Sequence, residues 1–296
     1  MSKLTIRSFA KLNIALDVLD KRADGYHNIE SVIQLICLRD RLTLARREDA
    51  VVEVRATDPG VPTGLGNLAY RAAVIFFEAC GLKAGIDIEI EKLIPMEAGL
   101  GGGSSNGTAT LAGLNELFGR PLAHRDLWRL AARLGSDAPF FLSGGAAFVS
   151  GRGDLVRDLP DFSLDYVVVK PAFGVSTGWA YGKLDAAERT PRHASRAVMD
   201  AILEGDRTRI VQNMANDFQF VVESAHPEIA RIRTRLLSLG ADGAMLAGSG
   251  SAVFGAFLDP VVCDRAYNEI KGEFPNVFRT RSAPRKESSP AEPACG

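Results

Sequence analysis

Residues 95–105 read P-M-E-A-G-L-G-G-G-S-S, and this stretch decides the fold. Four of the five positions from Gly99 to Gly103 are glycine, so the loop carries almost no side chains. Backbone N–H groups in such a loop can approach a ligand that a Cβ atom would keep away. The stretch predicts a phosphate-binding loop, with an ordinary flexible turn as the alternative.

The loop lies between an expected strand and an expected helix. Isoleucines alternate with acidic residues over 86–91, which is typical of a half-buried strand. After the loop, apolar residues follow helical spacing as far as Gly119, with Ser104 or Ser105 as the expected N-cap. Free N–H donors and a partial positive charge at a helix N-terminus suit a polyphosphate. We therefore expect a nucleotide phosphate site here.

Two well-known phosphate-binding motifs do not match this loop. A Walker A loop has Lys after its last glycine, but here Ser104 follows Gly103. A dinucleotide-binding loop has a third glycine or alanine where Ser104 stands, and an acidic residue at the end of the next strand. The loop is neither, and this mismatch argues against a dinucleotide-dependent oxidoreductase.

Length and composition narrow the class of protein. The 296 residues suit two lobes that share a cleft, and a net charge of −1 leaves no excess of Lys and Arg for a nucleic-acid backbone. Charges interrupt the N-terminal residues, and no run approaches the about 20 apolar residues of a membrane helix. The cysteines form no C-x-x-C pair, so we interpret them as reduced thiols. We expect a cytoplasmic protein with a small-molecule partner, no nucleic acid, no membrane and no assigned metal ligand.

Patterns of apolar and turn residues predict the remaining elements. Strands are expected over residues 4–18, as a pair within 31–44, and over 166–170, and Asn67 is expected to cap a helix that ends at Gly81. The other expectations are helices over 123–134, 198–203, 208–220 and 227–239, a crossing between lobes over 155–164, a small-residue loop at 247–251 and a disordered tail over 283–296.

Four residues have both a structural and a functional interpretation. Lys11 could be a solvated charge on a strand, and Tyr26 and His27 could be ordinary core-edge or surface residues. Asp137 could be the N-cap of a following helix. Taken singly, each residue favours the structural role, so function depends on how they combine.

Taken together, three stretches resemble the motifs of the galactokinase, homoserine, mevalonate and phosphomevalonate (GHMP) kinase superfamily. They are A-K-L-N at 10–13, P-M-E-A-G-L-G-G-G-S-S at 95–105 and G-S-G-S at 248–251. K-R-A-D-G-Y-H at 21–27 and G-S-D-A-P-F-F-L-S-G-G at 135–145 are similar to the branch that acts on cytidine diphosphate-linked methylerythritol. The resemblance covers nearly everything except the tail.

The resemblance implies an α+β, two-lobed GHMP kinase fold with the active site in the cleft between the lobes. It places an N-terminal ATP-binding domain at residues 1–155 and a C-terminal domain at residues 156–282. It also implies phosphoryl transfer from ATP to the 2-hydroxyl of the methylerythritol unit, in the non-mevalonate route to isoprenoid precursors.

The resemblance assigns roles residue by residue. Asp137 would accept the hydroxyl proton, and Lys11 would keep Asp137 ionised. Mg²⁺ is expected with ATP, and Ser105 is only a candidate ligand. The implied ATP-binding residues are Asn67, Lys92, Pro95, Met96, Glu97, Ala98, Gly99, Leu100, Gly101, Gly102, Gly103, Ser104 and Ser105. The implied substrate-binding residues are Asn13, Tyr26, His27, Tyr181, Gly248 and Ser249.

Some assignments and two other functions stay open at this point. Trp179 competes with Tyr181 for the stacking role, and Glu97 would repel phosphate if its carboxylate pointed inward. Another GHMP kinase, for mevalonate, homoserine or a sugar, would keep the glycine loop but have no use for the D-G-Y-H turn. A non-catalytic nucleotide-binding relative is disfavoured because both Lys11 and Asp137 are present.

Overall fold

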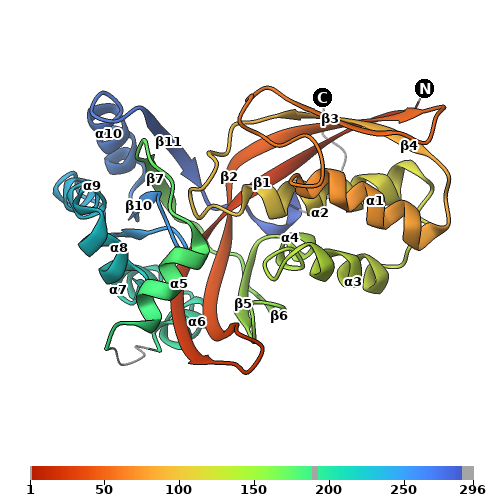
Figure 1. Ribbon diagram of the computed structural model, residues 1–296. Helices are drawn as coiled ribbons and strands as arrows, with labels where there is room; N and C mark the ends of the chain where they lie inside the picture. The colour runs from red at the N-terminus through yellow and green to blue at the C-terminus, as the bar shows by residue number, and fades with distance from the viewer. Residues whose placement is uncertain (1, 189–192, 289–296) are drawn as a thin grey trace.

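The computed structural model describes residues 2–188 and 193–288, and within them the strands form a seven-stranded and a four-stranded sheet (Figure 1). The first sheet has the order β3-β4-β2-β1-β8, and β5 pairs with both β2 and β6. The second has the order β11-β7-β10-β9. Helices cover both sheets, which confirms the expected α+β class.

The first lobe is built on the larger sheet, and helices α1, α2 and α3 pack together against it (Figure 1). Its strands are β1 (Lys3–Lys21), β2 (His27–Arg47), β3 (Val52–Ala56), β4 (Gly85–Glu91), β5 (Ala146–Ser150) and β6 (Leu155–Leu159). Its helices are α1 (Leu68–Cys80), α2 (Gly102–Leu117), α3 (His124–Leu134) and α4 (Phe140–Ser143).

The second lobe is built on the smaller sheet, with α9 and α10 packed on its strands. Its strands are β7 (Asp165–Lys170), β9 (Gly243–Leu246), β10 (Val253–Phe257) and β11 (Asn276–Arg281), and β8 (Ala215–Asn216) joins the first sheet. Its helices are α5 (Thr177–Asp185), α6 (Ala194–Glu204), α7 (Arg207–Gln212), α8 (Gln219–Ala225), α9 (Pro227–Ser238) and α10 (Pro260–Ile270). No helix among the described residues is long and apolar enough to cross a bilayer.

A long antiparallel hairpin, β1 with β2, runs through both lobes (Figure 1). Ile6 in β1 packs in the core of the first lobe, whereas Leu16 and Val18 pack in the core of the second. The sequence predicted a pair of strands where β2 is continuous, and that prediction was wrong. Asp40 in its middle is buried and accepts hydrogen bonds from Leu93 N and Ile94 N, so the strand does not need to break there.

Two other elements expected from the sequence differ in the structure: a helix is divided, and a crossing between lobes starts later than expected. The expected helix over 208–220 is split between α7 and α8, because Asn216 turns away to donate its amide to Leu246 and Gly248 oxygens. The expected crossing over 155–164 begins with β6, which pairs with β5. In the first case contacts with a distant segment override the local pattern, and in the second a hairpin with the preceding strand does so.

Helix ends follow the sequence in one case and depart from it in another. Asn67 caps α1 as expected, accepting a hydrogen bond from Ala69 N at 2.8 Å. The expectation that Ser104 or Ser105 caps α2 was wrong, because α2 begins at Gly102 and both serines lie inside its first turn. Gly101 occupies the cap position in the left-handed region, and no side chain caps this end.

The first residues of the expected disordered tail, 283–288, are ordered in the structure. Ala283 is fully buried and donates its N–H to Leu35 O at 2.8 Å. Pro284 leads into a short helix, α11 (Arg285–Ser288), and the Arg285 guanidinium donates to Ser143 and Ala146 oxygens. Residues 283–288 therefore belong to the fold, and residues 289–296 lie outside the described part.

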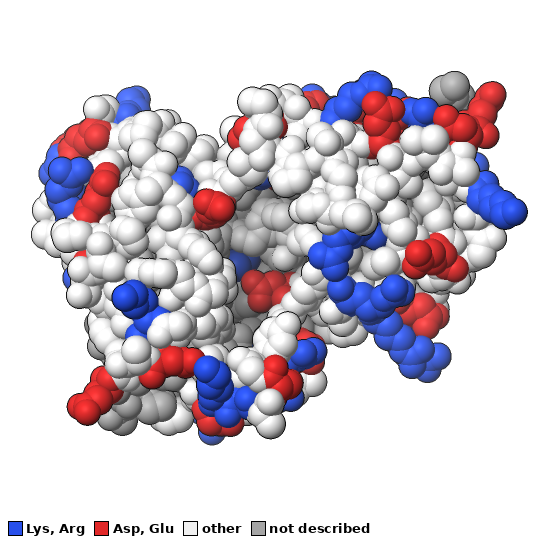
Figure 2. Space-filling view, viewed as in Figure 1, with Lys and Arg blue, Asp and Glu red and all other residues white. Residues whose placement is uncertain are grey.

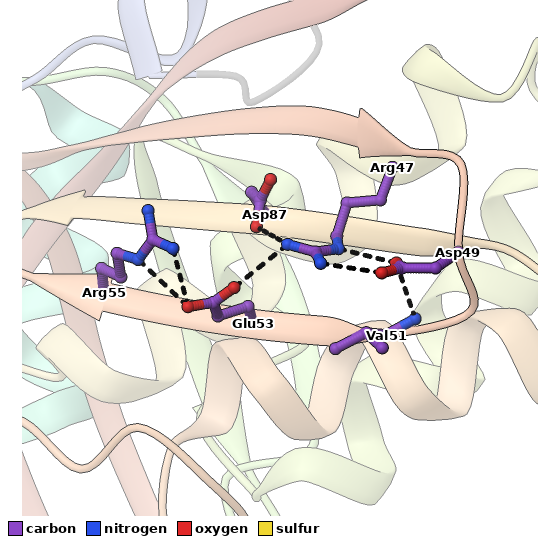
Figure 3. A network of polar contacts seen from close by, with 6 residues as sticks. All are labelled: Arg47, Asp49, Val51, Glu53, Arg55 and Asp87. Atoms are coloured by element: carbon purple, nitrogen blue, oxygen red, sulfur yellow. Dashed lines mark hydrogen bonds and ion pairs between the residues drawn. The ribbon is translucent and has the colours of Figure 1, made fainter.

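An ion-pair network joins β2, β3 and β4 at the outer edge of the first sheet (Figure 3). Arg47, the last residue of β2, binds Asp49, Glu53 and Asp87, and Arg55 also binds Glu53. Hydrogen bonds from Arg47 lower the pKa of Asp49 to about 2. Exposed pairs of this kind contribute little each, so the network fixes the register of an edge rather than the overall stability.

The two glycine-rich loops, residues 95–103 and 247–251, touch where the lobes meet. Ser251 N donates to Glu97 O and Ala252 N donates to Ala98 O, both at 3.2 Å. A Cβ atom on Gly99 would lie 1.9 Å from Ala247 O. The backbones can approach this closely only because the loop lacks a side chain at Gly99.

We predict that Gly99→Ala destabilises the protein by about 3 kcal/mol, because the new Cβ meets a backbone carbonyl and φ is +74°. Gly103→Ala is the matched control: its Cβ would meet only Leu68 Cδ1 at 3.7 Å, in a helix that favours alanine. Urea unfolding of both variants measures the difference. Equal losses of stability would contradict the role given to the loop contact.

Candidate active site

A cavity of about 480 Å³ lies where the glycine loop, β1, α5 and the loop 247–251 meet. Figure 2 shows the surface hollowed between the two lobes, with both basic and acidic atoms visible inside. Most of the residues assigned from the sequence line this cavity. They are Lys11, Asn13, Asn67, Lys92, Pro95, Met96, Glu97, Ala98, Gly99, Leu100, Gly101, Gly102, Gly103, Ser104, Asp137, Tyr181, Gly248 and Ser249.

The glycine loop lacks side chains partly because it packs closely against other residues of the same protein. A Cβ atom on Gly101 would lie 2.8 Å from Phe141 Cζ and 3.0 Å from Lys11 Cγ, and one on Gly102 would lie 3.0 Å from Ile94 Cγ2. Lys11 N donates to Leu100 O at 3.0 Å, which ties the loop to β1. The loop is thus held from behind while its open side, with the N-terminus of α2, faces the cavity.

Lys11 and Asn13 form a buried polar pair on β1. Lys11 Nζ donates to Asn13 Oδ1 at 2.5 Å, and Asn13 Nδ2 donates to Ser31 Oγ at 2.8 Å. Ser31 Oγ in turn donates to Ala15 O, so the chain of hydrogen bonds ends on the backbone. Asn13 therefore orients the ammonium group in the cavity wall.

Asp137 lines the same cavity from the turn before α4. No side chain caps α4, so the capping role considered for Asp137 is not observed. Burial lowers the pKa of Lys11, and attraction to Asp137 opposes that shift. Among the ion pairs of the described residues, none within 4.0 Å joins Lys11 to Asp137, although both line the cavity.

The resemblance placed His27 and Tyr181 in one substrate pocket; their rings do meet, but of the two only Tyr181 is among the described residues that line the cavity. Their rings stack with centroids 4.8 Å apart, and the Tyr181 ring also meets Phe218 edge-on. His27 Nε2 lies 2.6 Å from Asp185 Oδ1, and the other oxygen of Asp185 accepts from Lys21 Nζ. Burial raises the pKa of Tyr181 to about 12. Contacts from β1, β2 and α5 thus fix the ring pair.

The other two aromatic candidates lie elsewhere. Tyr26 is 54% exposed, with the Arg152 guanidinium 5.0 Å from its ring centroid, and it is not among the described residues that line the cavity. Trp179 packs against His226 with ring centroids 5.5 Å apart, also away from the cavity lining. Tyr181 is therefore better placed than Trp179 to stack on a ligand in the cavity.

The carboxylate of Glu97 points toward the second lobe. Its Oε2 lies 2.1 Å from the position that a Cβ atom would take on Gly174, and its charge opposes the lowering of the Lys170 pKa by burial. Glu97 itself has a positive φ of 50°. The side chain is directed across the lobe junction, while the backbone of the residue belongs to the loop.

The two serines after the loop face different ways. Ser105 Oγ accepts a hydrogen bond from Ser8 Oγ at 2.8 Å, and Ser105 is buried outside the cavity lining. Ser104 does line the cavity, so its hydroxyl is the one that can meet a phosphate or a metal ion. The described residues contain no group of three or more His, Cys, Asp or Glu side chains arranged to hold a metal.

Several residues of the site were missed by sequence reasoning. Asn106 and Thr177 line the cavity, and the Thr177 hydroxyl lies 3.0 Å from that of Ser249. Asp40 is buried behind Lys92, and its Oδ2 lies 2.8 Å from Lys92 Nζ. A signal existed for Asp40, the only acidic residue between Glu30 and Glu48, and for Thr177, which stands four residues before Tyr181 on one helix.

Comparison with known proteins shows which family this chain resembles. The models for the GHMP kinases N terminal domain and the GHMP kinases C terminal domain match residues 67–145 and 198–276. A solved structure of 4-(cytidine 5'-diphospho)-2C-methyl-D-erythritol kinase has a TM-score of 0.80 and 31% identity, covering 95% of this chain and 100% of that chain. Homoserine kinase from Cytophaga hutchinsonii, at 19% identity and a TM-score of 0.72 over 94% of each chain, shares the fold alone.

Curated relatives narrow the family further. The protein from Moorella thermoacetica is 40% identical over 286 residues, which are 95% of this chain and 100% of the relative. The protein from Alkaliphilus metalliredigens is 36% identical over 288 residues, which are 97% of this chain and 99% of the relative. Both relatives are named 4-diphosphocytidyl-2-C-methyl-D-erythritol kinase. With this likeness over nearly its whole length, the chain belongs to the family of 4-diphosphocytidyl-2-C-methyl-D-erythritol kinases within the GHMP kinases.

Proposed function

We propose that this protein transfers the γ-phosphoryl group of ATP to the 2-hydroxyl of 4-diphosphocytidyl-2-C-methyl-D-erythritol, in the non-mevalonate route to isoprenoid precursors. The observation that carries the proposal is the near full-length likeness to kinases of that name. The cavity supports it, because Lys11, Asp137 and the glycine loop line one space. A cytoplasmic location stays a prediction from the sequence, as do the domain limits of 1–155 and 156–282.

The glycine-loop end of the cavity would bind ATP. Backbone N–H groups at the start of α2 and the helix dipole suit its phosphates. The resemblance puts Asn67 and Lys92 near the nucleoside part, and the Lys92 ammonium group also lies beside Gly102, at the start of α2. Mg²⁺ prefers oxygen ligands and keeps several waters, so phosphate oxygens with the Ser104 hydroxyl would suit it. When bound, the ion would offset charge on the phosphoryl oxygens.

The chemistry would take place between the loop and β1. Asp137 accepts the proton of the attacking hydroxyl, and Lys11, held by Asn13, places a positive charge beside the reacting oxygens. Proton transfer of this kind supplies about 10²- to 10⁴-fold in rate, so positioning and phosphate electrostatics supply most of the rest. The aromatic end, with Tyr181 and Phe218, would hold the cytosine.

We expect ATP turnover with the cytidylylated methylerythritol substrate, and none with mevalonate, homoserine or galactose. Asp137→Asn keeps the shape of the side chain but removes the base, so kcat should fall about 10²- to 10⁴-fold. A coupled ADP-release assay measures turnover, and calorimetry checks that the variant still binds a non-hydrolysable ATP analogue. Turnover of mevalonate or homoserine instead would refute the assignment of the substrate.

Lys11→Met should lower kcat about 100-fold while thermal stability is kept or raised, because the charge is buried at some cost. Burial lowers the pKa of Lys11, so below this lowered pKa the buried ammonium group reduces the free energy of unfolding by its full amount. As pH rises toward the ordinary pKa of 10.5, Lys11 becomes neutral in the folded protein and this cost disappears. The stability gained by the variant should therefore shrink with rising pH, as denaturant unfolding can measure.

Lys170→Met is the matched control for Lys11. Lys170 is also buried, with its pKa lowered by burial, but it donates to the Pro171 and Phe173 oxygens outside the cavity lining. We expect this control to lose stability, because the Pro171 and Phe173 oxygens each lose one donor, and to keep kcat. A similar loss of kcat in both variants would show that Lys11 acts only through the fold.

Tyr181→Ala should raise KM for the cytidylylated substrate about tenfold, because one stacking face is lost, and leave KM for ATP unchanged. Trp179→Ala, on the same helix but outside the cavity lining, is the control. Steady-state kinetics with each substrate varied in turn separates the two constants. If Trp179→Ala gave the larger effect, Trp179 would be the stacking residue.

A further inference from the structure

Asp40 is the acceptor for a cluster of N–H groups behind the glycine loop. It is fully buried in β2, and its Oδ1 accepts from Leu93 N at 2.7 Å and Ile94 N at 2.8 Å. Its Oδ2 accepts from Lys92 Nζ at 2.8 Å and Asn106 Nδ2 at 2.9 Å. A buried carboxylate with this many donors is strongly held in place.

The donors come from both ends of the glycine loop. Lys92 to Ile94 lead from β4 into the loop, and Asn106 lies in the first turns of α2 beyond it. Asn106 Nδ2 also donates to Ser8 Oγ at 2.8 Å, and Ser8 Oγ donates to Ser105 Oγ. The Asp40 carboxylate therefore fixes the position of the residues that lead into the loop and of the first turns of α2.

Lys92 connects this cluster to the cavity. Its Nζ binds Asp40 and Ile94 O, and it lies 3.3 Å from the position that a Cβ atom would take on Gly102, the first residue of α2. An ammonium group has three donors, and Lys92 lines the cavity. Burial lowers the pKa of Lys92, and Asp40 and Asp58 oppose that shift. Asp40 thus favours a charged Lys92 beside the helix N-terminus.

We propose that Asp40 is a positioning residue for the nucleotide, which holds Lys92 and the entry of the glycine loop so that a charged ammonium group meets a phosphate of the bound nucleotide. The proposal rests on the proposed function only in taking ATP as the ligand. It assigns Asp40 no contact with ATP and no part in the proton transfer.

Asp40→Asn tests the proposal directly. The amide can still accept from the backbone N–H groups, but its Nδ2 would face the donors of Lys92 and Asn106. We expect affinity for a non-hydrolysable ATP analogue, measured by calorimetry, to fall about tenfold or more, and affinity for adenosine to change less than about twofold. As this affinity falls, KM for ATP should rise, while KM for the acceptor substrate stays unchanged.

Asp17→Asn is the matched control. Asp17 is also a fully buried carboxylate on the same hairpin, and its oxygens accept from Ala194 N and Ser195 N at the start of α6, outside the cavity lining. A general loss of stability would affect both variants, but only Asp40→Asn should weaken binding of the ATP analogue. Equal weakening in both variants, or none in a folded Asp40→Asn, would overturn the proposal.

A double variant covers the case in which Asp40→Asn does not fold. Replacing both members of a buried ion pair costs less than breaking it, so Asp40→Asn with Lys92→Met should fold. Its affinity for the ATP analogue should equal that of Lys92→Met alone, because Asp40 acts through Lys92. A further loss in the double variant would overturn the proposal. Binding of the analogue needs no acceptor, so a wrong assignment of the acceptor leaves this test intact.

Discussion

The close approach of two backbones at the lobe junction is the constraint on which the site depends. Gly99 stands against Ala247, and hydrogen bonds from Ser251 and Ala252 to the residues just before Gly99 join the two loops beside that contact. One loop comes from the first lobe and the other from the second, so the contact sets the distance between opposite cavity walls. The glycine thus serves the packing of the protein as much as the approach of a ligand.

The same closeness places charged side chains where solvent is scarce. Lys11 and Lys92 are both held by neighbouring oxygen atoms, and burial lowers the pKa of each. Their nearby carboxylates differ: Asp40 contacts Lys92 directly, whereas Asp137 attracts Lys11 from beyond ion-pair distance. A closed pair suits a structural anchor, and an open pair leaves space for a reacting group.

The sequence predicted best those features that are local. The bare loop and the Asn67 cap depend on a few neighbouring residues, and the structure has both. Features set by tertiary contacts were missed. Asp40 looks like the end of a strand until its donors are known, and a helical pattern cannot show that Asn216 turns aside to bind the second small-residue loop.

Helix geometry explains why the adjacent residues Ser104 and Ser105 have different surroundings. The two ends of the cavity also differ in chemistry. Consecutive helical residues point about 100° apart, so Ser104 faces the cavity while Ser105 binds Ser8. The cavity likewise has a polar end of backbone donors and an aromatic end with Tyr181 and Phe218. One end suits phosphates and the other a base, so a single cavity can take a nucleotide donor and a nucleotide-linked acceptor without one replacing the other.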